Sequence, residues 1–179
     1  SHSRREQGGL PFEKGGMRGI YNMAIAKRTD ILGRDLLATY RVTDGRWEDL
    51  DLDTLTRPLS GALVNDMATV QGVDNAVQAV IHRIKTIKGE LADLGHPEYG
   101  SRHHELIGEP NSVHNRNLVK LYILQALALE PRIEKIHKAT IVFDHQRAPD
   151  QVQIDLTLSF IGVQAQANLV IPFSFEGAA

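Results

Sequence analysis

The sequence has no cysteine among its 179 residues, which excludes disulfide bonds and thiolate metal sites. It has no run of about 18 apolar residues and no secretory apolar stretch after Ser1, so we expect a soluble protein that does not insert into a membrane. A net charge of −2 gives no general attraction for nucleic acid. Hydrophobic residues still make up 42% of the chain, which is typical of a globular domain with a sizeable core.

Residues 1–34 differ in composition from the rest. They hold six of the 15 glycines and carry seven arginines and lysines against three acidic residues, a net charge of +4. Such a segment has too few apolar residues to fold alone, and two interpretations stay open: a flexible terminus, or an arm that orders on an acidic partner. Residues 36–42 are compatible with a strand, followed by an Asp44-Gly45 turn. We therefore expect an N-terminal arm with a short hairpin at 1–57 and the main domain at 58–179.

Two segments have helical apolar periodicity. Residues 73–87 carry one apolar stripe, which predicts a helix that is N-capped by Asp74 and ends at Lys88-Gly89. Residues 115–129 are apolar around almost the whole circumference, which predicts a helix that is buried on more than one side. Pro131 fits its end, because the residue before a proline disfavours helical geometry.

After the second helix the apolar period changes from 3.6 to 2. Alternation predicts strands at 139–145, 151–161 and 164–174, which form an antiparallel meander with one apolar face. The two helices are the available cover for that face, so we expect an α+β fold. A meander at the end of the chain leaves a strand edge unpaired, which suits strand addition by another protein unless the N-terminal arm covers it. The polar face of the last strand carries the uncharged residues Gln164, Gln166 and Asn168, so it has few of the charges that hinder strand addition at an exposed edge.

The segment between the helices is rich in histidine. Zinc accepts imidazole ligands, and His96, His103, His104 and His114 are the candidates. The helical HExxH arrangement is absent, and the adjacent pair His103-His104 is expected to point in different directions. We therefore expect a solvated loop with no bound metal.

Glu90 and Glu130 are the acids in apolar surroundings. A glycosidase needs two carboxyl groups, one of them with a pKa raised by an apolar pocket. Each acid has a simpler explanation, because a buried charge is normally paired: Glu90 with a basic group or backbone N–H groups, and Glu130 with Arg132 or another arginine. We expect no enzymatic activity and no cofactor, and keep a peptidoglycan-cleaving glycosidase that uses Glu90 and Glu130 as the alternative.

Three short motifs resemble those of the baseplate wedge family of contractile tails, the GPW-type or lysozyme-like wedge proteins. Residues 83–90 resemble its helix ending RLxTxxGE, residues 96–101 resemble its loop rPxYGS, and residues 130–133 resemble its EPRI signature. The resemblance covers roughly residues 60–175. Ile84 stands where the family usually has leucine, and the loop at 102–114 does not align. The structural motif residues are Arg83, Thr86, Gly89, Glu90, Pro97, Tyr99 and Gly100.

The resemblance implies a structural role. Members of the family join the baseplate wedge to the first sheath ring in contractile phages, type VI secretion systems and extracellular contractile injection systems, where their strands pair with sheath strands. Carried over, Glu130, Pro131 and Arg132 dock on the wedge core bundle. The strands at 139–145, 151–161 and 164–174 face the sheath, and Gln164, Gln166 and Asn168 are the residues expected at the strand pairing. The resemblance implies six copies per baseplate, in a virion tail or an injection particle that is assembled in the bacterial (host) cytoplasm. The expected partners are the tail sheath protein and the wedge core-bundle proteins, with hub or tube proteins as candidate contacts of the arm.

Overall fold

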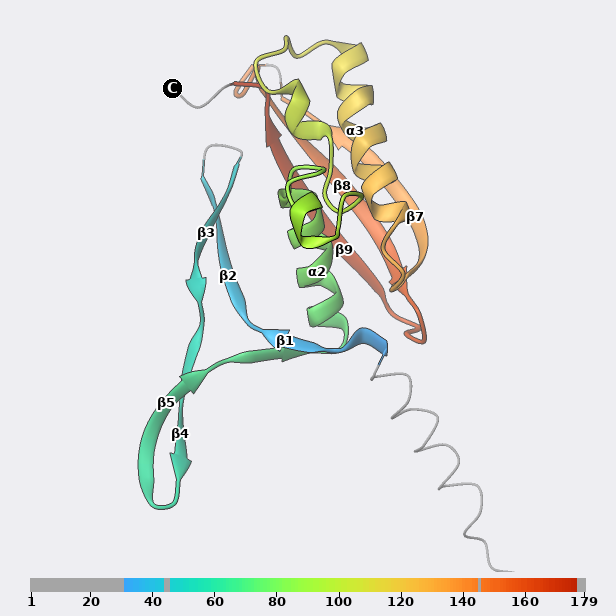
Figure 1. The fold of residues 1–179 in the computed structure, drawn as a ribbon. Helices are drawn as coiled ribbons and strands as arrows, with labels where there is room; N and C mark the ends of the chain where they lie inside the picture. Colours follow the sequence, from blue (N-terminus) through green and yellow to red (C-terminus); the bar gives the residue numbers. More distant parts are fainter. Residues whose placement is uncertain (1–30, 44–45, 145, 177–179) are drawn as a thin grey trace, which may run out of the picture.

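The computed structural model describes residues 31–43, 46–144 and 146–176, with the backbone alone at 40–51 (Figure 1). Most of the expected basic arm and its Asp44-Gly45 turn lie outside these residues. The described elements follow one another as β1 (Arg34–Leu36), β2 (Ala38–Thr43), β3 (Arg46–Leu52), β4 (Thr54–Leu59), β5 (Ala62–Met67), β6 (Thr69–Gln71), α2 (Val73–Lys85), η1 (Ala92–Leu94), η2 (His103–Leu106), α3 (Val113–Ala128), β7 (Ile133–Val142), β8 (Gln151–Phe160) and β9 (Gln166–Ser174).

The last three strands form an antiparallel sheet in the order β7-β8-β9, so the predicted meander is confirmed. Its first strand begins at Ile133 rather than at residue 139. The register of β7 against β8 shifts after Ile133 and again after Ile136, and each shift interrupts the alternation of apolar and polar residues. A search for strict period two therefore finds only the second half of β7.

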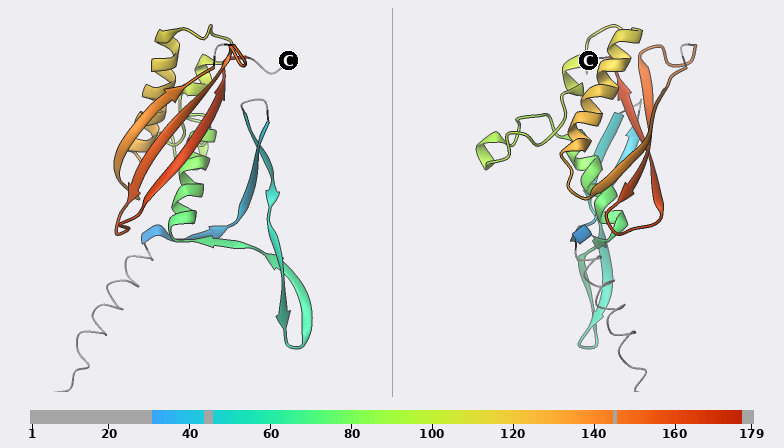
Figure 2. Two further views of the ribbon diagram at one scale, coloured as in Figure 1. Left: turned by 180° about the vertical axis from the view of Figure 1, so that it is seen from behind. Right: turned by 90° about the vertical axis from the view of Figure 1, so that its right-hand side faces the viewer.

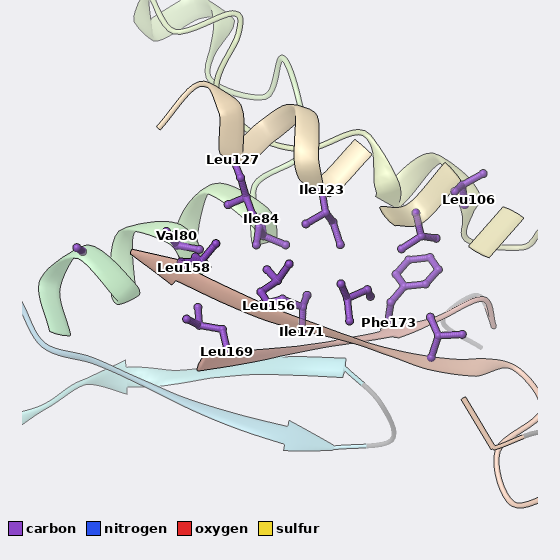
Figure 3. Packing of buried hydrophobic residues seen from close by; sticks show 14 of the residues in the cluster. Val80, Ile84, Leu106, Ile123, Leu127, Leu156, Leu158, Leu169, Ile171 and Phe173 are labelled. Atoms are coloured by element: carbon purple, nitrogen blue, oxygen red, sulfur yellow. The ribbon is translucent and has the colours of Figure 1, made fainter. Parts of the chain in front are cut away.

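Helices α2 and α3 lie on the same face of this sheet (Figure 2), which confirms the α+β class. The alternate β8 residues Ile154, Leu156 and Leu158 are at most 1% exposed. Leu156 and Leu158 lie between the helices and the sheet (Figure 3). Burying one such side chain contributes about 1.5–3 kcal/mol. The core therefore depends on the apolar period of β8 meeting the apolar stripe of α2.

Helix α2 differs from the prediction at both ends. Its N-cap is Gly72, and Asp74 lies in the first turn without capping it. The helix ends at Lys85, because the N–H of Ser101 donates to the carbonyl of Thr86 and the N–H of Lys88 donates to the carbonyl of Ser101. This pairing draws the chain out of the helix before it reaches the predicted end.

Helix α3 begins at Val113, where the hydroxyl of Ser112 accepts the N–H of Asn115 and caps the first turn. Its buried face includes Val119 and Ile123, both 0% exposed. On the other side Leu121 is 46% exposed, so the prediction of burial on more than one side is wrong for the outer side. No helix in the described part of the chain has the length and apolarity that crossing a bilayer requires.

Before α2, the chain forms three two-stranded ribbons, β1 with β6, β2 with β3, and β4 with β5 (Figure 1). They meet at one junction, where three backbone hydrogen bonds form a ring. Leu37 donates to Ala68 (2.9 Å), Ala68 donates to Asp53 (2.9 Å), and Asp53 donates to Leu37 (2.8 Å). The β4 strand runs across the expected division at 57/58, which stays a prediction as a domain boundary.

Two buried amide side chains of α2 hold the ribbons against the domain. Gln78 accepts the N–H of Ala38 (3.0 Å) and donates to the carbonyl of Leu36 (2.8 Å), while Asn75 donates to the carbonyl of Leu32 (2.6 Å). Both amides are 5% exposed. Each satisfies backbone groups that the short ribbons leave unpaired.

Candidate functional site

An acid–arginine cluster lies where α3 ends and β7 begins. Glu130 is 4% exposed, and its carboxylate accepts hydrogen bonds from Nε of Arg132 (2.6 Å), Nε of Arg83 (3.2 Å) and the backbone N–H of Arg132 (3.3 Å). The guanidinium of Arg83 lies over the ring of Tyr99, 4.4 Å from its centroid. The cluster therefore brings together one residue or more from each of the three motifs that the sequence singles out.

The charge state of Glu130 follows from these contacts. Burial raises the pKa of its carboxyl, but the hydrogen bonds and positive charge of Arg132, together with the charge of Arg83, outweigh burial and lower the pKa below its usual value. Glu130 is thus ionised at neutral pH and bound on both oxygens. A general acid for glycoside cleavage needs the opposite shift.

The simpler explanations for both candidate acids are confirmed. Glu130 pairs with Arg132 and with a second arginine, Arg83. Glu90 is exposed, and its carboxylate accepts the N–H of Ile87 (3.1 Å), which stabilises the turn after α2. Both contacts are structural.

The remaining motif residues shape the chain between α2 and η2. Gly100 has a φ of +100°, and an added Cβ would lie 2.7 Å from the carbonyl oxygens of Thr86 and Ile87. A side chain is therefore excluded where the loop crosses the end of α2. Gly89 also has a positive φ, of +89°, but open space around its α-carbon. The hydroxyl of Thr86 donates to the carbonyl of His82 (2.9 Å).

Of the three predicted docking residues, two reach the surface. Pro131 is exposed, and the side chain of Arg132 is 26% exposed. The carboxylate of Glu130 is buried, and its ion pair with Nε of Arg132 fixes the position of that guanidinium. Docking by Pro131 and Arg132 stays a prediction.

The outer edge of β9 has no strand partner in the part of the chain that the structure describes. β3 contacts β9 without joining its ladder. Gln166 and Asn168 are exposed on this strand, as predicted from the sequence. Gln164 precedes the strand, because the turn at Gly162 delays its start.

The two edges of the sheet are unlike each other. The β7 edge carries two register shifts and the exposed charged residues Glu134, Lys135 and Lys138, which hinder the approach of another strand. β9 pairs with β8 in unbroken register and carries no charged side chain. Its one irregularity for a partner is Pro172, which has no N–H.

The prediction that the histidine-rich loop is solvated is wrong for its central residue, His103. His103 is 4% exposed and its ring centroid is 4.0 Å from that of His104, so the two rings lie together rather than apart. They fold inward because residues 103–106 form the short helix η2 against the core, where the ring of His103 contacts Phe173 edge to face. Among the described residues, no three side chains that could bind a metal lie close together.

Comparison with known proteins finds similarity at the level of solved structures. No family model and no curated protein matches the chain. A solved structure from Geobacter sulfurreducens, of a protein provisionally named a tail lysozyme, is similar with a TM-score of 0.51 and 21% identity. The match covers 60% of this chain and 94% of that one. The likeness is one of fold.

Proposed function

We propose that the chain is a structural component of a contractile tail or injection system, in which it links the baseplate wedge to the first sheath ring and has no catalytic role. The fold shared with a protein provisionally named a tail lysozyme supports the tail assignment. Residues of the three family-like motifs meet in the Glu130 cluster, which supports the wedge assignment. The observation that carries the sheath role is the unpaired, uncharged outer edge of β9.

The register of β9 determines which groups a sheath strand would meet. Phe175 donates its N–H to Asp150 at the β8 side, and Pro172 has no N–H to donate. Successive N–H groups alternate between the two sides of a strand, so the odd-numbered residues bond to β8 and the even-numbered ones face outward. An added strand would therefore pair with the backbone of Gln166, Asn168 and Val170.

The second contact is made by the corner that follows α3. The Nε of Arg132 donates to Glu130, and its terminal nitrogens would bind a partner carboxylate. Pro131 fixes the backbone direction at the same corner. We assign this surface to the helical core bundle of the wedge.

A proline substitution on the β9 edge tests strand addition. Gln166→Pro removes an outward N–H and leaves the ladder with β8 intact, so the variant folds but no longer initiates sheath polymerisation when wedge and sheath proteins are mixed. Gln164→Pro is the matched control, because Gln164 precedes the strand; it initiates sheath normally.

Circular dichroism melting establishes that both variants fold, and electron microscopy counts the sheaths that start from baseplates. A folded Gln166→Pro variant that initiates as many sheaths as the wild type contradicts the proposal.

A further inference from the structure

A pocket of about 240 Å³ lies between α2, η2 and β9. It is smaller than the roughly 300 Å³ at which pockets for drug-sized ligands begin, so it suits a single side chain better than a free metabolite. Consecutive residues of β9 border it, so the pocket reaches the backbone at the outer margin of that strand. Its main walls are Ile84, His103, Ile107, Ile171, Pro172 and Phe173.

The polar side chains that border the pocket are Lys85, His103, His104 and Ser174, and the imidazole of His103 is only 4% exposed. We assign the proton of His103 to Nδ1, because this tautomer satisfies both contacts of Ser101: its hydroxyl donates to the carbonyl of Tyr122 (3.4 Å) and its oxygen accepts from Nδ1 of His103 (2.9 Å). The Nε2 atom of this tautomer has a lone pair and no proton. Within the described parts of the chain, no group donates a hydrogen bond to it.

The imidazole stays neutral across the physiological range. Burial, together with the nearby His104, lowers the pKa of His103 from 6.5 to about 3. A buried acceptor without a donor is costly, and such groups are rare in folded proteins. The pocket therefore favours an occupant that combines an apolar body with one hydrogen-bond donor.

We propose that the pocket receives one tyrosine or tryptophan side chain from the strand that a partner adds along β9. The phenol O–H or indole N–H donates to Nε2 of His103, and the ring packs against Ile84 and Phe173. A side chain on the helix-covered face of the added strand, opposite Ile171 or Phe173, has the required direction. The inference rests on the proposed strand addition and gives it a sequence preference, because an aliphatic side chain leaves Nε2 unpaired.

The chemistry of the pocket is tested without a partner. p-Cresol and toluene, the side-chain analogues of tyrosine and phenylalanine, are titrated into the full chain while NMR follows the His103 ring and the Ile84 and Ile171 methyl groups. p-Cresol shifts these resonances and binds about fivefold more tightly than toluene, the factor that one net hydrogen bond supplies. Absence of shifts at His103, or equal affinity for the two compounds, overturns the inference.

Substitutions locate the binding. Ile107→Trp at the 43% exposed rim fills the pocket and abolishes p-cresol binding, whereas Ile87→Trp, 52% exposed and outside the pocket, retains it. His103→Phe removes the acceptor and makes the two affinities equal; if this variant does not fold, Ile107→Trp still decides. Retained binding in Ile107→Trp rejects the pocket as the site.

The sheath-initiation assay distinguishes a failure of this inference from a failure of the proposed function. Ile107→Trp lowers initiation and Ile87→Trp does not. Normal initiation by Ile107→Trp rejects the aromatic anchor alone. Normal initiation by a folded Gln166→Pro variant rejects strand addition itself, and with it the added strand as the source of the ring.

Discussion

Removing the carboxylate of Glu130 provides a quantitative test of the cluster. The side chain of Glu130 is 2% exposed and that of Arg83 is 10% exposed, so Glu130→Ala leaves a buried guanidinium without its acid. Breaking a buried ion pair in this way costs about 3–5 kcal/mol. Arg132→Ala removes a partner that is 26% exposed, while Glu130 keeps Arg83, so we expect a loss of only about 1–2 kcal/mol.

Urea denaturation followed by circular dichroism measures both losses. The double variant Glu130→Ala/Arg132→Ala should be hardly less stable than Glu130→Ala alone, because the pair is already broken. The stable Arg132→Ala variant should still assemble poorly with wedge proteins, since it lacks the planar fork that pairs with a carboxylate. Equal losses for Glu130→Ala and Arg132→Ala would refute the distinction between an enclosed acid and a surface arginine. Normal wedge assembly by the Arg132→Ala variant would contradict the docking role of Arg132.

Three further outcomes follow from the structure. The Gly100→Ala variant should unfold at a lower urea concentration than the Gly89→Ala variant. Both substitutions replace a glycine of positive φ, but only at Gly100 does the new Cβ lie 2.7 Å from backbone oxygens. Equal unfolding midpoints would contradict this close approach. Gln78→Ala should accelerate amide hydrogen exchange at Ala38, whose acceptor it removes, and unchanged exchange would mean that the side chain does not hold the ribbons. The contribution of His103 to the free energy of unfolding should fall as the pH drops from 6.5 toward 3, by at most about 1.4 kcal/mol per pH unit, because the unfolded chain protonates at His103 while the folded chain does not. His103→Phe should therefore make this part of an acid titration less steep, and an unchanged slope would exclude the buried imidazole as a cause.

The sequence predicts the main elements because their burial is one-sided and regular. The alternation in β8 and the stripe of α2 each mark a single buried face, and these faces meet in the core. The end of α2 is set instead by pairing of Thr86 with Ser101, fifteen residues away, which no local pattern contains. The β2–β3 hairpin follows from the strand pattern expected at 36–42 and confirms that prediction. The β4–β5 ribbon escapes prediction, since β4, with the sequence Thr-Leu-Thr-Arg-Pro-Leu, buries no face at all.

The candidate site, too, is predicted by the sequence only in part. That Glu130 pairs with an arginine follows from the general cost of a buried charge, but the choice of Arg83 and its stacking on Tyr99 depend on how α2 and the loop pack together. Nothing in the sequence distinguishes His103, which is buried, from His104, which is partly exposed. Their difference arises when η2 places one ring against Phe173 and leaves the other at the rim.

The node where the three ribbons join consists only of main-chain atoms, those of Leu37, Asp53 and Ala68. These hydrogen bonds use no side-chain atom, so a substitution at the tip of the β4–β5 hairpin removes none of them. The exposed residues Leu59 and Leu63 can therefore be substituted to suit a different partner without loss of the hydrogen bonds that attach the hairpin to the other ribbons.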